Sequence, residues 1–288
     1  MTRYQKYVEL ERVKTMVTNK TKEQFEHHCE LAQNAFPEED YIWFGTFLYG
    51  SQNYGLDTEE SDIDTVSLYI PTIKTLSREN SHTRLLAMEN KFNDYCTEPS
   101  RVKDHVGFRD IRLWIEGLKK GNPNAIELFY STCKEINDEF YDAWLYLNAQ
   151  DVLKFNPERT ISALKGMVNS NLKHIWKPRE GNEEDSDRKY NVKAFSEVIR
   201  LTHTLFNYIN PNSNYMNIFV PKDAVRKFIL SAKNGELMYE DAKAWTGVCE
   251  YILRNFDFLK KPVRAFTDDP EFLRDWVERL FEMALIKS

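Results

Sequence analysis

The pattern of hydrophobic and polar positions divides the chain into two parts of different character. Residues 41–49 read YIWFGTFLY, a run of β-formers that is typical of a strand. Residues 64–69, DTVSLY, alternate in polarity and predict a second strand, which Pro71 closes. Beyond about residue 150 the apolar positions recur at helical spacing throughout. We therefore expect an α+β protein, with a small α/β half of residues 1–150 and an all-α half of residues 151–288.

Residues typical of helix starts and strands predict further elements in the first half. Residues 1–38 have a helical pattern, within which Thr21 and Gln24 have the spacing of a capping box. Residues 102–108, VKDHVGF, predict a short third strand. Asp110 follows this strand and is in position to cap the N-terminus of a helix.

Prolines mark most of the other helix starts that we expect. They stand at residues 123, 157, 221 and 270, and the first two directly follow an asparagine that suits an N-cap. Residues 179–189, REGNEEDSDRK, are strongly charged and predict a mobile loop between helices.

Composition narrows the class of protein. The chain has 288 residues, 42% hydrophobic and 29% charged, which is typical of a soluble globular protein. We find no apolar run of about 18 residues and no secretory signal, so we expect a cytoplasmic protein with no membrane partner. Four scattered cysteines favour reduced thiols over a zinc site. The net charge of −6 argues against extensive binding to duplex DNA.

Two acids near the start of the second predicted strand are the first candidates for chemistry. Asp62 and Asp64 are two residues apart, so on a strand they lie on the same face. Two carboxylates about 4 Å apart repel each other by roughly 4 kcal/mol at an effective dielectric of about 20, and a cation between them removes this cost. Carboxylate oxygens at a strand end suit Mg²⁺ or Mn²⁺ bridging to phosphate. The alternative is that DTEESDID is only a solvated acidic turn.

A Gly-Ser pair lies close to these acids in the sequence. Gly50 permits a close approach of phosphate to the main chain, and the hydroxyl of Ser51, with N–H groups at a following helix start, can hold it. An anion-binding turn and a dication site then stand at adjacent strand ends. This combination suits the binding of a nucleoside triphosphate with its metal ions.

The segment GSQNYGLDTEESDID resembles the signature of the nucleotidyltransferases of the DNA polymerase beta superfamily, in which Gly-Ser precedes an Asp-hydrophobic-Asp motif. It is most similar to a bacterial and phage group of predicted nucleotidyltransferases. Three later segments, GNPNAIELFYS, KAFSEVIRL and SAKNGEL, are also similar to that group. The resemblance covers roughly residues 41–240.

This resemblance implies a small polymerase-beta-like mixed sheet and a two-metal nucleotidyl transfer. Gly50 and Ser51 would hold the β- and γ-phosphates, and Asp62 and Asp64 would hold Mg²⁺ or Mn²⁺. A hydroxyl would attack the α-phosphate in line and release pyrophosphate. The helical half would complete the cleft for the nucleotide and the acceptor.

The family pattern also requires a third carboxylate on a neighbouring strand. We expect Asp104 to supply it, because Asp104 opens the short strand before the helix that Asp110 caps. Glu127 is the runner-up, since it stands in an otherwise apolar helical segment. The alternative for Glu127 is an exposed helix glutamate with no role in a site.

Two basic residues of the second half match the family's helix motif. Lys193 and Arg200 are seven residues apart and share one helix face, from which they would neutralise a triphosphate. The alternative is a solvated basic face. Glu197 stands where the family pattern often has histidine, which is a departure from it.

The acceptor and the donor base stay open at this stage. A protein hydroxyl, a small molecule such as an antibiotic, and an RNA 3′ end all fit the chemistry, and ATP is assumed as donor from its abundance. The main alternative to an enzyme is a catalytically inactive nucleotide-binding or protein-interaction module, antitoxin-like or inhibitory, on the same scaffold. A nucleic-acid-binding factor is a weaker alternative, because the chain has no surplus of basic residues.

Overall fold

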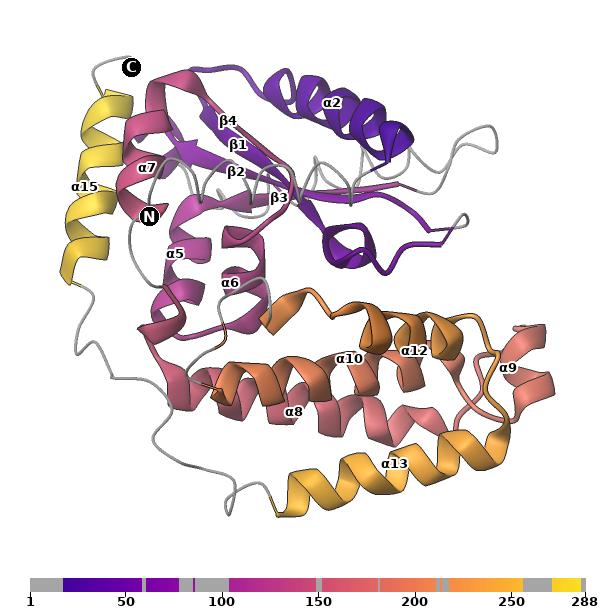
Figure 1. The fold of residues 1–288 in the computed structure, drawn as a ribbon. Helices are drawn as coiled ribbons and strands as arrows, with labels where there is room; N and C mark the ends of the chain where they lie inside the picture. The colour runs from indigo at the N-terminus through magenta and orange to yellow at the C-terminus, as the bar shows by residue number, and fades with distance from the viewer. Residues whose placement is uncertain are drawn as a thin grey trace. The chain divides into compact units, whose positions relative to one another are not determined.

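A computed structural model gives the fold (Figure 1). It describes residues 18–58, 61–77, 85, 104–148, 152–180, 182–210, 213, 218–255 and 271–285. The fold is mixed α+β, which confirms the expected class at that level. Two compact units make up the chain. Unit 1 comprises Met1–Lys119, Asn124–Val152 and Asp268–Ser288, and unit 2 comprises Lys120–Pro123 and Leu153–Thr267.

Within the described residues, unit 1 contains a four-stranded sheet in the order β3-β2-β1-β4. The strands are β1 (Tyr41–Tyr49), β2 (Asp64–Pro71), β3 (His105–Asp110) and β4 (Lys134–Ile136). Strand β1 is antiparallel to both β2 and β4, and β2 is parallel to β3. The first three strands are those that the pattern predicts. The three residues of β4 are too few to give a pattern, and we did not predict this strand.

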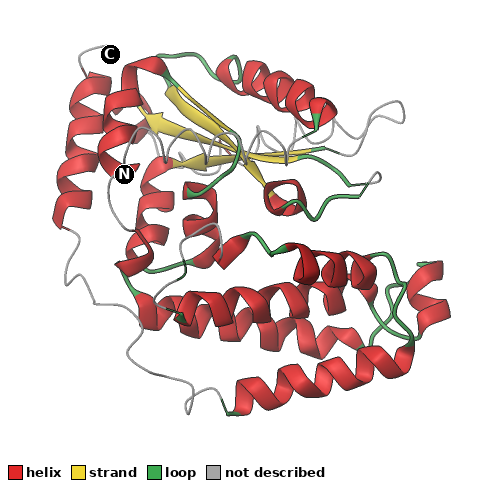
Figure 2. Ribbon diagram, in the orientation of Figure 1, coloured by secondary structure: helices red, strands yellow, loops and turns green. Residues whose placement is uncertain are grey.

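Helices cover both faces of the sheet in unit 1 (Figure 2). Helix α2 (Asn19–Gln33) covers one face, where Tyr69 donates a hydrogen bond to the carbonyl of Ala32 (2.8 Å). Aromatic side chains of β1 pack on the other face, for example Phe47 against Trp114 of α5. The helices on that side are α5 (Ile111–Lys119), α6 (Pro123–Phe129), α7 (Tyr141–Asn148) and α15 (Glu271–Leu285). The short elements of unit 1 are η1 (Gly50–Tyr54), α3 (Ile73–Leu76) and η2 (Asp138–Phe140).

Helix α15 belongs to unit 1, although its position in the sequence placed it in the helical half of residues 151–288. Trp276 is its anchor: the ring is 1% exposed and packs edge-on against Phe44 of β1. The indole N–H also donates a hydrogen bond to the carbonyl of Ala143 on α7 (2.6 Å). The division at residue 150 is therefore corrected for the C-terminal helix.

The start of α2 differs from the predicted capping box. Thr18 is the N-cap, and its hydroxyl accepts a hydrogen bond from the main-chain N–H of Thr21 (3.1 Å). The side chain of Thr21 instead donates to Gln52 (3.0 Å), and that of Gln24 donates to Asp104. Thr21 therefore joins α2 to η1, and Gln24 joins it to the residue before β3. Residues 1–17, where we also expected helix, lie outside the described residues.

The described part of unit 2 is helical. Its elements are η3 (Val152–Lys154), α8 (Pro157–Ile175), α9 (Glu183–Arg188), α10 (Val192–Ile209), α12 (Asp223–Lys233) and α13 (Tyr239–Arg254). Helix α10 packs against α8, α12 and α13 and is the central helix of the unit. The predicted start at Asn156-Pro157 is confirmed, with Asn156 as the N-cap. None of the described helices in either unit combines the length and the apolar character needed to cross a membrane.

The charged segment 179–189 is not a simple loop. It contains α9, and Asp185 on this helix is fully buried. The carboxylate of Asp185 accepts hydrogen bonds from the guanidinium of Arg179 (2.8 and 2.9 Å) and from the main-chain N–H of Val192 (3.0 Å). The acid therefore joins α9 to the start of α10, and the loop prediction is wrong for this stretch.

The Asp185 contacts predict an acid-sensitive contribution to stability. Burial acts to raise the pKa of Asp185, but hydrogen bonds from Arg179 and Val192 outweigh it and hold the pKa below its usual 3.8. Because the pKa of Asp185 is lower in the folded than in the unfolded protein, its carboxylate stabilises the fold at every pH above the unfolded-state pKa. This stabilisation is lost as the pH falls through the folded-state pKa. We expect Asp185→Asn to lower the free energy of unfolding by about 2 kcal/mol at pH 7.

Urea unfolding from pH 7 down to pH 3 measures this effect, and the difference between wild type and variant should shrink as the pH falls. Asp187→Asn, an exposed position on the same helix, is the matched control and should change little. Equal stability of the two variants at pH 7 would contradict a structural role for Asp185.

Candidate functional site

Gly50 and Asp64 meet where β1 ends and β2 begins. Tyr49, the last residue of β1, pairs with Asp64 in the antiparallel ladder, and Gly50 follows directly. Gly50 has a φ of +72°, and a Cβ on it would lie only 2.7 Å from Oδ2 of Asp64. The left-handed backbone therefore favours glycine, and any Cβ would also force the Asp64 side chain to move. The main chain of Gly50 lies directly beside the Asp64 carboxylate.

The strand pattern predicts that Asp62 and Asp64 lie on the same side of the sheet, and β2 begins at the second of them. Ile63 between them packs into the cluster of Phe25 and Cys29 on α2. Thr65 also faces α2, because its hydroxyl hydrogen-bonds to the ring of His28 (3.0 Å). Side chains alternate along a strand, so Asp64 points to the opposite face, and the same alternation continued back past Ile63 would place Asp62 there too. Asp62 is exposed and Asp64 is half-buried.

Asp104 is on the other face of the sheet. Its Oδ1 accepts a hydrogen bond from the main-chain N–H of Ile63 (3.1 Å), and its Oδ2 accepts one from Gln24 on α2. The Nε2 atom of His28 lies 3.6 Å from the same Oδ2. We expected Asp104 to share a metal with Asp64, and this expectation is corrected. Asp104 precedes β3 and is two and four residues from Val106 and Phe108. It therefore lies on the same face as these two side chains, which face α2.

The hydrogen bonds of Asp104 keep its carboxylate ionised. Burial acts to raise its pKa, but the His28 ring, the N–H of Ile63 and the Gln24 amide together hold it below the usual value. The carboxylate is 4% exposed and ionised at neutral pH, so it ties α2 firmly to the main chain between the two aspartates. Asp104 is therefore well placed to position the acidic motif.

Glu127, the runner-up for the third acid, lies on α6 and is 4% exposed. The alternative that it is an exposed helix glutamate is therefore wrong. Among the described residues, no group of three or more histidine, cysteine or acidic side chains has an arrangement that could hold a metal ion. A cation at Asp62 and Asp64 would thus take its other ligands from substrate oxygens or water, which is common for Mg²⁺.

The turn that follows β1 is fixed on two sides. Asn53 accepts hydrogen bonds from the main chain and the hydroxyl of Thr132 (2.7 and 2.8 Å), and Gln52 accepts the bond from Thr21. The turn is η1, a 3-10 helix of five residues, and not the start of a regular helix. The expected anion site therefore depends on the main chain of Gly50 and the half-exposed Ser51.

Sequence reasoning missed a cation on the same face as Asp64. His105 pairs with Asp64 in the parallel ladder, so Gly107 and Arg109 lie farther along that face. A Cβ on Gly107 would lie 3.8 Å from Nη2 of Arg109, so the guanidinium extends back over the glycine. The signal in the sequence was the alternation HVGFRD, in which a glycine separates two basic side chains on one face.

Lys193 and Arg200 belong to α10 of unit 2, whereas the other predicted site residues belong to unit 1. Lys193 is exposed. Arg200 is buried, and its Nη2 donates to Oε2 of Glu197 (2.8 Å) one turn earlier. The expected contact of these two cations with a triphosphate stays a prediction.

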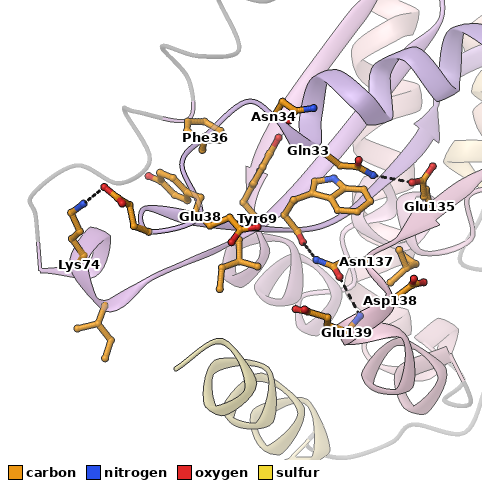
Figure 3. A pocket seen from close by; sticks show the side chains of 16 residues that line it. Gln33, Asn34, Phe36, Glu38, Tyr69, Lys74, Glu135, Asn137, Asp138 and Glu139 are labelled. Atoms are coloured by element: carbon orange, nitrogen blue, oxygen red, sulfur yellow. Dashed lines mark hydrogen bonds and ion pairs between the residues drawn. The ribbon is translucent and has the colours of Figure 1, made fainter. Parts of the chain in front are cut away.

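A large hollow lies at the other ends of β1 and β2 (Figure 3). Its volume is about 1250 Å³, and Lys74, which binds Glu39 (2.8 Å), is the single cation among its described lining residues. Five carboxylates line it: Glu38, Glu39, Glu135, Asp138 and Glu139. Such an excess of negative charge repels a triphosphate. The Gly50 end of the sheet is therefore the better place for phosphate.

Comparisons with protein-family models, with curated proteins and with solved structures found no match. The functional argument consequently depends on local geometry. That geometry combines the carboxylate of Asp64 with that of Asp62 just before the strand, a glycine beside Asp64, a serine hydroxyl and, farther along the same face of the sheet, a guanidinium. These groups can bind a divalent cation together with phosphate oxygens.

The contact between Gly50 and Asp64 predicts coupled substitutions. Gly50→Ala places an alanine in a left-handed backbone conformation, which costs about 1–2 kcal/mol of stability. Its Cβ would also overlap the Asp64 carboxylate. Asp64→Ala removes the overlap and leaves only the backbone cost. We therefore expect Gly50→Ala to be milder in the Asp64→Ala background by at least about 1 kcal/mol. Urea unfolding of the wild type, both single variants and the double variant measures this coupling, and additivity would show that the contact is not tight.

Proposed function

We propose that this protein is a metal-dependent nucleotidyltransferase with a polymerase-beta-like sheet. It would move a nucleoside monophosphate from a nucleoside triphosphate to a hydroxyl acceptor. The observation that carries the proposal is the closeness of Gly50 to Asp64, since a Cβ on residue 50 would overlap the Asp64 carboxylate, with Asp62 two residues before Asp64. A place for phosphate and a place for a dication are then adjacent, as nucleotidyl transfer requires.

The donor set fits Mg²⁺ or Mn²⁺. Both are hard cations that prefer oxygen ligands, and Mg²⁺ is typically held by one or two carboxylates together with substrate phosphates. Asp62 and Asp64 would be those carboxylates. When bound, the cation would neutralise negative charge on the phosphoryl group. Asp104 would act through the main chain of Ile63, by keeping the acidic motif in place.

The other side chains would bind and orient the triphosphate. The Gly50 main chain and the Ser51 hydroxyl would hold the β- and γ-phosphates, and Arg109 would add a positive charge on the same face. Lys193 and Arg200 of unit 2 would neutralise further charge. The acceptor oxygen would form a bond to the α-phosphorus, and the bond to the leaving pyrophosphate would break.

The acceptor in this proposal is a protein, a small molecule or an RNA end, and ATP is the first donor to test. A second candidate function is a nucleotide-binding or protein-interaction module, inhibitory or antitoxin-like, that carries out no transfer. One observation favours this alternative: the described residues bring only two carboxylates together at the site, with Asp104 on the opposite face. Binding without pyrophosphate release distinguishes it from the enzyme.

Asparagine substitutions at the two acids test the enzyme directly. Asp62→Asn and Asp64→Asn keep the size of each side chain but remove its charge. We expect each to lower Mg²⁺-dependent pyrophosphate release from a nucleoside triphosphate by at least about 100-fold, a loss of about 3 kcal/mol in transition-state stabilisation. The measurement is pyrophosphate release with each of the four ribonucleoside triphosphates.

Asp57→Asn, in the same acidic segment but before the motif, is the matched control and should retain activity. Asp104→Asn separates positioning from ligation. It keeps the oxygen that accepts the Ile63 N–H, so a positioning role predicts little change in the half-saturating Mg²⁺ concentration, whereas removal of a charged ligand should raise it by at least the roughly tenfold that loss of an outer-shell partner costs. Absence of pyrophosphate release from the wild type under all these conditions would contradict the enzyme and favour the binding module.

A further inference from the structure

Helix α13 of unit 2 packs against α10 on one side and is exposed on the other. Its buried side chains form one stripe along the helix: Ala242, Thr246, Cys249 and Leu253. A second stripe consists of exposed residues only, and their alternating spacing of four and three places them on one helix face. We name the following five residues the outer stripe: Glu240, Ala244, Gly247, Tyr251 and Arg254.

The middle of the outer stripe combines a large exposed ring with two small residues. Tyr251 is 69% exposed, more than any other large hydrophobic side chain among the described residues. A Cβ on Gly247 would meet no heavy atom of another part of the described chain within 4 Å. Ala244 lies one turn before Gly247, so a facing helix can approach this part of α13 closely.

The charges of the outer stripe are complementary to themselves. Glu240 and Arg254 are each seven residues from Gly247, on opposite sides of it. On an antiparallel copy of α13 that crosses at Gly247, each of these charges therefore meets the opposite charge. Lys243 and Glu250, which flank the stripe four residues before and three after Gly247, also meet opposite charges. In a parallel pair every charge would meet its own copy, so the pattern favours the antiparallel arrangement alone.

We propose that a second copy of this chain docks on α13, with the two α13 helices antiparallel about a twofold axis at Gly247. Tyr251 of each copy packs over Ala244 of the other, and Glu240 of each copy pairs with Arg254 of the other. Both copies then use the same surface, as a twofold dimer requires. The Arg254 side chain is 78% exposed although it binds Glu250 on its own helix (3.2 Å), so it can be shared with the second helix.

The size of this contact predicts a dimer that depends on concentration. Helix α13 has 16 residues and is about 24 Å long, so two such helices bury less surface than a permanent dimer does. Exposed ion pairs add little affinity, and here they mainly set the direction of pairing. This interface is independent of nucleotidyl transfer, because α13 belongs to unit 2 and contains none of the proposed catalytic residues.

Charge reversal tests the pairing, with sedimentation velocity on the full chain at increasing concentrations and with a reducing agent present. Glu240→Arg and Arg254→Glu each bring like charges together at two symmetric places, so each should raise the dimer dissociation constant at least about tenfold. The double variant Glu240→Arg/Arg254→Glu restores opposite charges and should return it to within about threefold of wild type. Both reversals oppose the helix dipole, so an effect within the helix alone would make the double variant the weakest dimer.

Gly247→Lys places two cations against each other at the twofold axis and should weaken the dimer at least about tenfold. Lysine is a better helix former than glycine, so this variant keeps α13 folded, which circular dichroism checks. Gly166→Lys on α8 is the matched control, because Gly166 is exposed and also has no described atom close to its Cβ position. It should dimerise as wild type does.

Three results would overturn the proposal. The first is a wild type that stays monomeric at every concentration. The second is a dimer that Gly247→Lys leaves intact. The third is a double charge reversal that dimerises no better than the single variants.

Discussion

The candidate site depends on the close approach of the Gly50 main chain to the Asp64 carboxylate. This contact exists because β1 and β2 pair up to their ends, with Tyr49 opposite Asp64, and because Gly50 turns away with a left-handed backbone. Any side chain at position 50 would overlap the carboxylate. One glycine thus brings together a turn that suits phosphate and an acid that suits a cation.

A second contact fixes the main chain of the two aspartates from the α2 side of the sheet. Asp104 and His28 are buried between α2 and the sheet, and Asp104 accepts the N–H of Ile63 between the two aspartates. The main chain of the motif is therefore anchored on the α2 face while its carboxylates face the other side. This division explains why an ionised buried acid lies beside the motif without taking part in it. It also means that α2, through Gln24, contributes to the geometry of the site.

Local patterns predicted most of the strands and helices but not the contacts between distant segments. The alternation along β2 correctly placed Asp64 on the face opposite α2, whereas Asp62 lies before the strand begins. The alternation of β3 groups Asp104 with the apolar Val106 and Phe108, so the sequence carried a signal for the α2 face that our prediction did not use. Trp276, which brings α15 into unit 1, and the buried pair of Asp185 and Arg179 depend on partners that no local pattern reveals.

Binding of Mn²⁺ in the presence of a nucleotide tests the central claim most directly. Electron paramagnetic resonance can count bound Mn²⁺ with α,β-methylene ATP, which resists transfer, for the wild type and the double variant Asp62→Asn/Asp64→Asn. If the two aspartates and the Gly50 turn form one site, wild type binds Mn²⁺ only with the nucleotide, and the double variant binds it at least about tenfold more weakly. Equal Mn²⁺ binding by the two proteins would contradict the account.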